Sequence, residues 1–167
     1  MWMAPFWSAC TERPLDLHSL GVPVVLAGRP FGNDDGLSYM DADNVGGATS
    51  AHAWPRHRGH GGRPARHVPG VDRLHGYRLT MAEAGLSDSG LIVFGDFGRG
   101  STEHAVYRLL DRRSGLDAVF VASDLMAAGA LRALRRSGRR VPDDVAVIGF
   151  EDSPLARHTD PKLTTVR

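Results

Sequence analysis

Cysteine and lysine are almost absent from this sequence, and these absences restrict the classes of protein that it can represent. Cys10 is the only cysteine, so no disulfide can form within the chain, and we expect a reducing compartment, with the cytoplasm as the default. Lys162 is the only lysine, and arginine supplies the rest of the 20 basic residues. Because 19 acidic residues leave a net charge of +1, the composition argues against a nucleic-acid coat or a polybasic membrane binder.

Long hydrophobic runs are also missing. The opening residues, MWMAPFWSACTERP, contain aromatic side chains but no basic start, and Pro5 and Glu12 interrupt them. They predict neither a signal peptide nor a membrane span. A length of 167 residues with 42% hydrophobic residues suits one domain, or one lobe and part of another.

The sequence lacks the common catalytic motifs. It contains no G-x-S-x-G elbow and no phosphate-binding G-x-x-x-x-G-K-[ST] loop. The letters DFG within Gly95–Gly98 lack the other motifs of a kinase, and Gly98–Gly100 is too short for a dinucleotide fingerprint. We therefore expect no catalytic residues, no cofactor and no enzyme, with an α/β enzyme of unknown type as an alternative.

What the sequence does contain is an alternation of strands and helices. The apolar runs predict strands at Val22–Ala27, Leu37–Met40, Leu91–Phe94, Asp117–Ala122, Val145–Phe150 and Leu163–Val166. Helical spacing and capping residues predict helices that begin near Val45, Leu74, Ser101 and Asp124. This order predicts an α/β fold with a parallel sheet flanked by helices.

Thr49–Gly70 differs from the rest of the chain. It holds four His, four Arg, four Gly and three Pro, and no acidic residue, Leu, Ile, Phe or Met. Such a segment has little apolar surface to offset its ordering entropy, so we expect a disordered or poorly packed insert. Its histidines, His52, His57, His60 and His67, lack the spacing and partners of a metal site, and we expect none.

Polar residues follow the ends of the predicted strands, where an open α/β sheet binds ligands. They are Asp43, Asp96-Phe97, Ser123-Asp124 and Glu151-Asp152, and Arg73 precedes the expected start of a helix. Carboxylates with one arginine suit a polyhydroxylated ligand, and Phe97 could stack on an apolar sugar face. Helix capping explains Asp43, Ser123 and Asp124 equally well, and a solvated turn before Pro154 explains Glu151-Asp152.

Asp117–Arg167 closely resembles the end of the effector-binding domain of the lactose/galactose-repressor (LacI/GalR) family. Earlier segments resemble successive parts of the same domain: GVPVVLAGRP, YMDADNVGGA, GVDRLHGYRLTMAEAGL and VFGDF. The resemblance covers roughly Leu20–Thr49 and Val71–Arg167, and it is most specific at Ala122–Leu134 and Val141–Asp152.

The resemblance implies a periplasmic-binding-protein-like fold of two α/β lobes, with a sugar or nucleobase bound between them. Arg73 matches the arginine that grips the effector, and Glu151 stands where the family usually has Asp. Ser123 matches a ligand-facing Asn or Ser, Phe97 an aromatic that can stack on the sugar, and Asp43 a polar residue of the other lobe. The expected ligand-binding residues are thus Asp43, Arg73, Phe97, Ser123, Asp124 and Glu151.

The chain also departs from the family pattern. Nothing matches the helix-turn-helix, the hinge helix or the first strand and helix of the N-terminal lobe, and the sequence stops at LTTVR. In Thr49–Gly70 the pattern is lost abruptly, as a pair of compensating frameshifts would produce. Residues 1–19 are assigned to neither lobe. We expect residues 20–70 to form part of the N-terminal lobe and residues 71–167 to form the C-terminal lobe.

These observations predict the effector domain of a LacI-type regulator that binds a carbohydrate-like effector. Operator DNA is expected as a partner only in full-length relatives, so this chain should not bind it unaided. The resemblance leaves a homodimer open, and a membrane partner is not expected. The alternatives are a periplasmic-type sugar-binding protein, which an export signal would favour, and a non-functional gene remnant.

Overall fold

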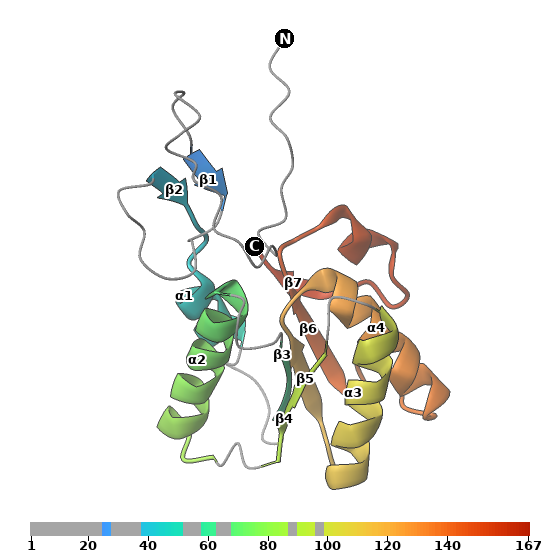
Figure 1. Ribbon diagram of the computed structural model, residues 1–167. Coiled ribbons are helices and arrows are strands. Elements are labelled where there is room, and N and C mark those ends of the chain that lie inside the picture. Colours follow the sequence, from blue (N-terminus) through green and yellow to red (C-terminus); the bar gives the residue numbers. More distant parts are fainter. Residues whose placement is uncertain (1–24, 28–37, 52–57, 63–67, 87–89, 96–98) are drawn as a thin grey trace.

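The computed structural model describes residues 25–27, 38–51, 58–62, 68–86, 90–95 and 99–167 (Figure 1). In chain order the elements are β1 (Val25–Ala27), β2 (Ser38–Met40), α1 (Asn44–Ala51), β3 (Arg58–Gly62), α2 (Val68–Glu83), β4 (Ile92–Phe94), α3 (Arg99–Arg112), β5 (Ala118–Val121), α4 (Asp124–Arg136), β6 (Ala146–Phe150), the 3-10 helix η2 (Pro154–His158) and β7 (Thr164–Val166). Every strand pair is parallel. The predicted α/β fold with a parallel sheet is therefore confirmed.

The order of the strands places a reversal point in the middle of the sheet. Five strands pair in the order β4-β3-β5-β6-β7, while β1 and β2 pair separately. From β3 the chain moves outward to β4, and it then returns to the other side of β3 to form β5, β6 and β7. In open α/β sheets, ligands bind beyond the carboxyl ends of the strands at such a reversal. The segments after β5 and β6 therefore begin at the edge of the sheet where a site is expected.

Helices cover both faces of the sheet (Figure 1). Strand β5 contributes side chains to the cores on both faces of the sheet, because successive side chains of a strand point to opposite faces. Val119 and Val121 belong to the larger core, under α3 and α4. Phe120 points to the other face, where it packs with Phe150 of β6 and Ala48 of α1. All four residues of β5 are buried, as expected for an inner strand of a parallel sheet covered on both sides.

The prediction of a disordered or poorly packed insert at Thr49–Gly70 does not hold for the backbone of Arg58–Gly62, which forms β3. This strand pairs on both sides, with His60 opposite Ile92 of β4 and Gly61 opposite Val121 of β5. An inner strand bonds through its backbone N–H and C=O groups, so its position between two neighbours can outweigh the weak strand preference of glycine. The helices also extend into the segment, α1 to Ala51 and α2 from Val68, while 52–57 and 63–67 lie outside the described residues.

The predicted lobe boundary at Val71 stays a prediction, but the large sheet includes residues that precede it. β3 belongs to the same sheet as β4 to β7, and α1 packs against α2 and β7. A unit that began at Val71 would lack β3, the strand that lies between β4 and β5 in the sheet. Because α2 begins at Val68, Arg73 lies in the second turn of this helix rather than before its start. Within the described ranges, no helix combines the length and the apolar character needed to cross a membrane.

Candidate functional site

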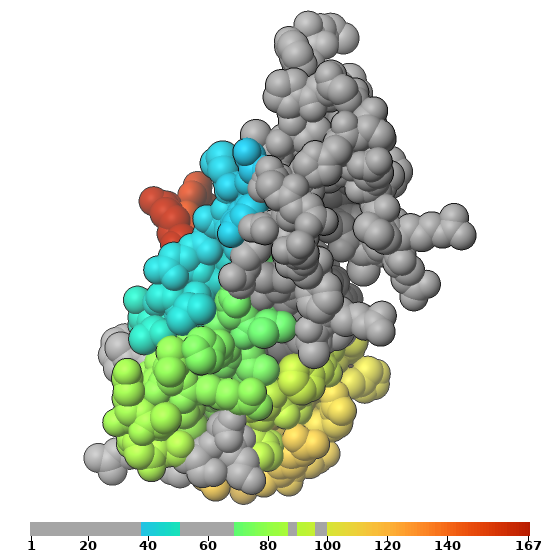
Figure 2. All heavy atoms as spheres, turned by 60° about the vertical axis from the view of Figure 1, so that its left-hand side comes forward, coloured from blue at the N-terminus to red at the C-terminus, as the bar shows by residue number. Residues whose placement is uncertain are grey.

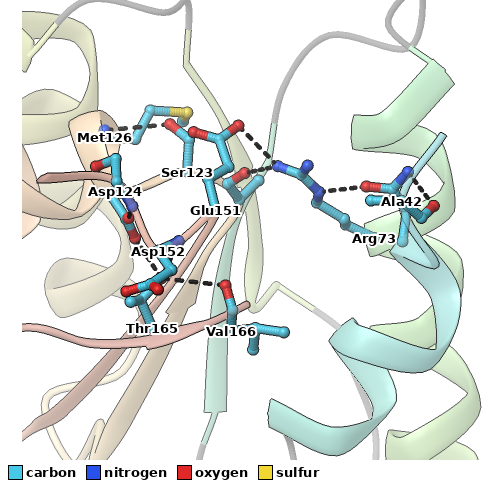
Figure 3. A network of polar contacts seen from close by, with 12 residues as sticks. Ala42, Arg73, Ser123, Asp124, Met126, Glu151, Asp152, Thr165 and Val166 are labelled. Carbon is cyan, nitrogen blue, oxygen red and sulfur yellow. Dashed lines mark hydrogen bonds and ion pairs between the residues drawn. The ribbon is translucent and has the colours of Figure 1, made fainter. Parts of the chain in front are cut away.

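Arg73 is the centre of a polar network beyond the ends of β5 and β6 (Figure 3). Its side chain extends from α2 and is only 6% exposed. The guanidinium Nε donates to Asn44 Oδ1 at 2.8 Å. Nη1 donates to the carbonyl oxygen of Ala122 and, at 3.3 Å, to Glu151 Oε1. One side chain thus joins the start of α1, the end of β5 and the loop after β6.

An aromatic ring lies beneath this arginine. The Arg73 guanidinium carbon is 3.9 Å from the centroid of the Phe150 ring, a cation-π distance. Phe150 in turn meets Phe120 edge to face, with ring centroids 6.4 Å apart. Burial lowers the pKa of Arg73 below its ordinary value, and the carboxylate of Glu151 opposes this effect. Because an arginine pKa starts so high, the guanidinium stays protonated at neutral pH.

Asn44 is fixed by bonds at both ends of its amide. Its Nδ2 donates to Asp41 Oδ1 at 3.1 Å and to the carbonyl oxygen of Ala42 at 3.0 Å. The amide oxygen therefore faces Arg73, and the residue is 3% exposed at the first position of α1. Since neither end of the amide can rotate without losing bonds, Asn44 helps to set the direction of the guanidinium.

Glu151 occupies an unusual backbone conformation. Its φ is 110° and that of the following Asp152 is 45°, backbone angles that residues other than glycine rarely adopt. Such conformations cost of order 1–3 kcal/mol each and persist where the surroundings hold them. The Glu151 side chain is 38% exposed, so its carboxylate both pairs with Arg73 and faces solvent.

Two of the predicted ligand residues act as helix caps. The Asp43 carboxylate accepts from the Gly46 backbone N–H at 2.8 Å, just ahead of α1. The Ser123 hydroxyl caps α4 by accepting from the Met126 N–H at 3.3 Å. Helix capping, the alternative to ligand binding in the sequence analysis, thus explains the polar side chains at both positions. Asp43 remains exposed and could still contact a ligand, whereas Ser123 is 1% exposed.

The structure places the other predicted ligand residues in different surroundings. The structure brings Arg73 and Glu151 together, as expected. Asp124 is 0% exposed, and its carboxylate accepts from the Ser153 N–H at 2.7 Å and the Thr165 hydroxyl at 2.6 Å. It does not bond to Arg73. Phe97 lies outside the described residues, so its predicted stacking role stays a prediction.

Sequence reasoning missed three members of the network: Asn44, Phe150 and the carbonyl of Ala122. Asn44 had a usable signal, because it follows Asp43 directly after a strand. Phe150 is the last residue of β6 and was predicted only as part of a strand. The Ala122 contact had no signal, since a main-chain acceptor carries no residue type. Contacts of this kind depend on how the strands are ordered.

The network offers both donors and acceptors at one edge of the sheet. A buried guanidinium, an amide and a partly exposed carboxylate can bind the hydroxyl groups of a ligand. In the part of the chain that the structure describes, no group of three His, Cys, Asp or Glu side chains could hold a metal ion. Of the four clustered histidines, only the backbone of His60 is described.

Comparison with known proteins identifies the family. Residues 56–167 match the family model of the periplasmic binding protein-like domain. The regulator CelR of Thermobifida fusca is 46% identical over 92% of this chain, and the regulator GalS of Salmonella typhimurium is 41% identical over 75%. The chain spans 47% and 38% of these two regulators, respectively, so it corresponds to less than half of each.

Solved structures agree. A structure described as a CelR–cellobiose complex superposes with a TM-score of 0.79 at 45% identity, over 87% of this chain and 46% of that one. A putative LacI regulator from Bacillus cereus subsp. cytotoxis superposes with a TM-score of 0.81 at 28% identity, over 89% of this chain and 55% of that one. With the fold, the matched model and these relatives in agreement, the chain belongs to the family of periplasmic binding protein-like effector domains of LacI/GalR-type transcriptional regulators.

Proposed function

We propose that this chain binds a small polyhydroxylated effector, a sugar, through the Arg73 network, as the sensing part of a LacI-type regulator. The observation that carries the proposal is the convergence of Arg73, Asn44 and Glu151 beyond β5 and β6, next to the reversal point between β3 and β5. A buried arginine whose position is set by an amide, a carbonyl and a carboxylate is already organised for ligand binding, so little ordering cost remains to be met when a ligand arrives.

Cellobiose is the effector we propose to test first. The relative of 46% identity is CelR, and the CelR structure with a TM-score of 0.79 is described as a complex with cellobiose. A disaccharide presents hydroxyl groups in several directions, which suits a site that combines a guanidinium with a carboxylate. Glucose, maltose and sucrose are the comparison ligands, because they share the hydroxyl chemistry and differ in size or linkage.

The first prediction concerns Arg73→Lys. Lysine keeps the charge but lacks the planar group that bonds to Asn44 and Glu151 at once. The Arg73–Glu151 pair is only partly buried, and loss of its bonds would also misplace the groups that face the ligand, so cellobiose affinity should fall by about 30-fold. Isothermal titration calorimetry on the wild-type and variant chains measures this change directly.

Arg135→Lys is the matched control. Arg135 is 65% exposed and pairs with the exposed Asp160, away from the Arg73 network. Its replacement should leave the affinity within about 2-fold, because exposed ion pairs contribute little. If Arg73→Lys binds cellobiose as tightly as Arg135→Lys does, the Arg73 network is not the binding site.

The relatives are transcriptional regulators, and we extend that role to this chain by proposal. In the complete regulator, effector binding shifts the balance between operator-bound and released states, and the chain itself performs no catalysis. This function implies action on DNA in the cytoplasm. That the chain alone does not bind operator DNA stays a prediction, which a gel-shift assay tests. Sedimentation tests whether the chain forms a homodimer.

A further inference from the structure

The loop that carries Glu151 is held by three successive hydrogen bonds. The N–H of Glu151 donates to the carbonyl oxygen of Val166 at 2.9 Å. The N–H of Asp152 donates to the Thr165 hydroxyl at 3.3 Å, and that of Ser153 to the Asp124 carboxylate at 2.7 Å. All three acceptors lie outside the loop, on β7 and at the start of α4. The loop conformation therefore depends on these two elements.

Asp124 connects the second and third of these bonds. One carboxylate oxygen accepts from Ser153, and the other accepts from the hydroxyl of Thr165 at 2.6 Å. Because the hydroxyl proton of Thr165 is given to Asp124, its oxygen is free to accept the N–H of Asp152. A single buried carboxylate thus orients the acceptor of one amide and is itself the acceptor of the next (Figure 3).

The packing around Asp124 leaves space for this carboxylate. Gly149 of β6 lies beneath it, and a Cβ at this glycine would come within 2.4 Å of Asp124 Oδ1. Asp124 also lies in the first turn of α4, where the helix dipole favours a negative charge. A carboxylate that is fully buried, satisfied at both oxygens and packed over a glycine is well suited to hold a backbone.

We propose that Asp124 is a positioning residue of the effector site: through Thr165 and Ser153 it holds the loop in the conformation that presents Glu151 to Arg73. This inference rests on the proposed function, since it assigns Asp124 a part in effector binding without contact to the effector. It replaces the expectation that Asp124 touches the ligand. Glu151 and Asp152 keep their positive φ values because the following amide is fixed.

The test is Asp124→Asn in the full chain. An amide keeps one acceptor oxygen for the Ser153 N–H and replaces the other with an NH2 group, so the charge is removed from both hydrogen bonds. Amide hydrogen exchange at Ser153, measured relative to Val147 in β6, should become faster by about 10-fold, because a hydrogen bond to a neutral oxygen is weaker than one to a charged oxygen. Cellobiose affinity should fall by about 10-fold.

Glu103→Gln is the matched control. Glu103 is a mostly buried carboxylate of α3 that pairs with Arg132 at 3.1 Å and Arg136 at 2.9 Å, so its loss weakens the α3–α4 contact rather than the loop. It should leave the relative exchange at Ser153 and the cellobiose affinity unchanged. If Asp124→Asn and Glu103→Gln give the same relative exchange at Ser153 and the same cellobiose affinity, Asp124 has only a structural role. That result would overturn the proposal.

Thr165→Val and Thr165→Ser keep the proposal testable if Asp124→Asn does not fold. Valine removes the hydroxyl and should speed exchange at Asp152, whereas serine keeps it and should restore protection. Equal exchange in the two Thr165 variants would contradict the proposed role. Failure of wild-type chain to bind cellobiose would refute that effector, and the exchange comparison would still decide the role of Asp124.

Discussion

At the scale of single residues, Arg140 and Asp144 form an ion pair in which nearly every polar atom is used. Asp144 Oδ2 accepts from the backbone N–H of Arg140 at 2.8 Å and from its Nε at 3.1 Å, and Oδ1 accepts from Nη2 at 2.8 Å. These hydrogen bonds lower the pKa of Asp144 from 3.8 to about 2. The carboxylate therefore stays charged in acid longer in the folded chain than in the unfolded chain.

This shift predicts a pH-dependent effect of Asp144→Asn. A lowered folded-state pKa gives a stabilising contribution that is present above the unfolded pKa of about 4 and is lost as pH falls toward 2. The variant should be less stable than wild type at pH 7, and the difference should shrink below pH 4. Urea unfolding at several pH values measures it. A difference that stays constant from pH 7 to pH 2.5 would contradict this linkage.

At the scale of elements, the contact between α1 and α2 positions Asn44 next to Arg73. The two helices lie side by side and form one continuous surface, cyan and green in Figure 2. Gly76 of α2 is at the contact: a Cβ there would lie 2.5 Å from the Val45 carbonyl oxygen and 2.9 Å from Ala48 Cβ. Because the first of these atoms is backbone, it cannot move without moving α1.

Gly76→Ala should therefore displace α1 and weaken the site without touching it. Alanine raises helix propensity by up to about 1 kcal/mol, but the contact with backbone is severe enough that we expect a net loss of about 1–3 kcal/mol. Cellobiose affinity should fall at the same time, because Asn44 moves away from Arg73. Gly115→Ala is the control, since a Cβ there meets nothing within 4 Å and the residue has no positive φ. Equal stability and affinity of the two variants would refute this coupling.

At the scale of the whole molecule, the sequence predicted the parts of the fold that depend on local pattern. The strands that become β5 and β6 and the helix α4 are found where apolar periodicity and Ser123 placed them. β3 was missed because its pairing comes from neighbours distant in sequence, and its residues carry no apolar pattern. In the site, Arg73 and Glu151 were predicted to be near each other, whereas the Ala122 carbonyl and the burial of Asp124 depend on three-dimensional packing.

The position of β3 also predicts which fragments fold. A chain of residues 41–167 keeps α1 and every strand of the large sheet, whereas 71–167 lacks β3 and leaves β4 without its neighbour. We expect cooperative thermal unfolding by circular dichroism for the first fragment and none for the second. A cooperative transition in 71–167 would place the boundary of the folding unit at Val71 after all.

The same strand order has a consequence for folding during synthesis. β3 can pair with β4 early, but its other partner is β5, which is made only after α2, β4 and α3. The partners of Arg73 are separated from it by 29, 49 and 78 residues in the chain, for Asn44, Ala122 and Glu151. Contacts between distant residues form late, because closing long loops is entropically costly. On the ribosome, the site that Arg73 organises is therefore completed only when the last part of this sequence has emerged.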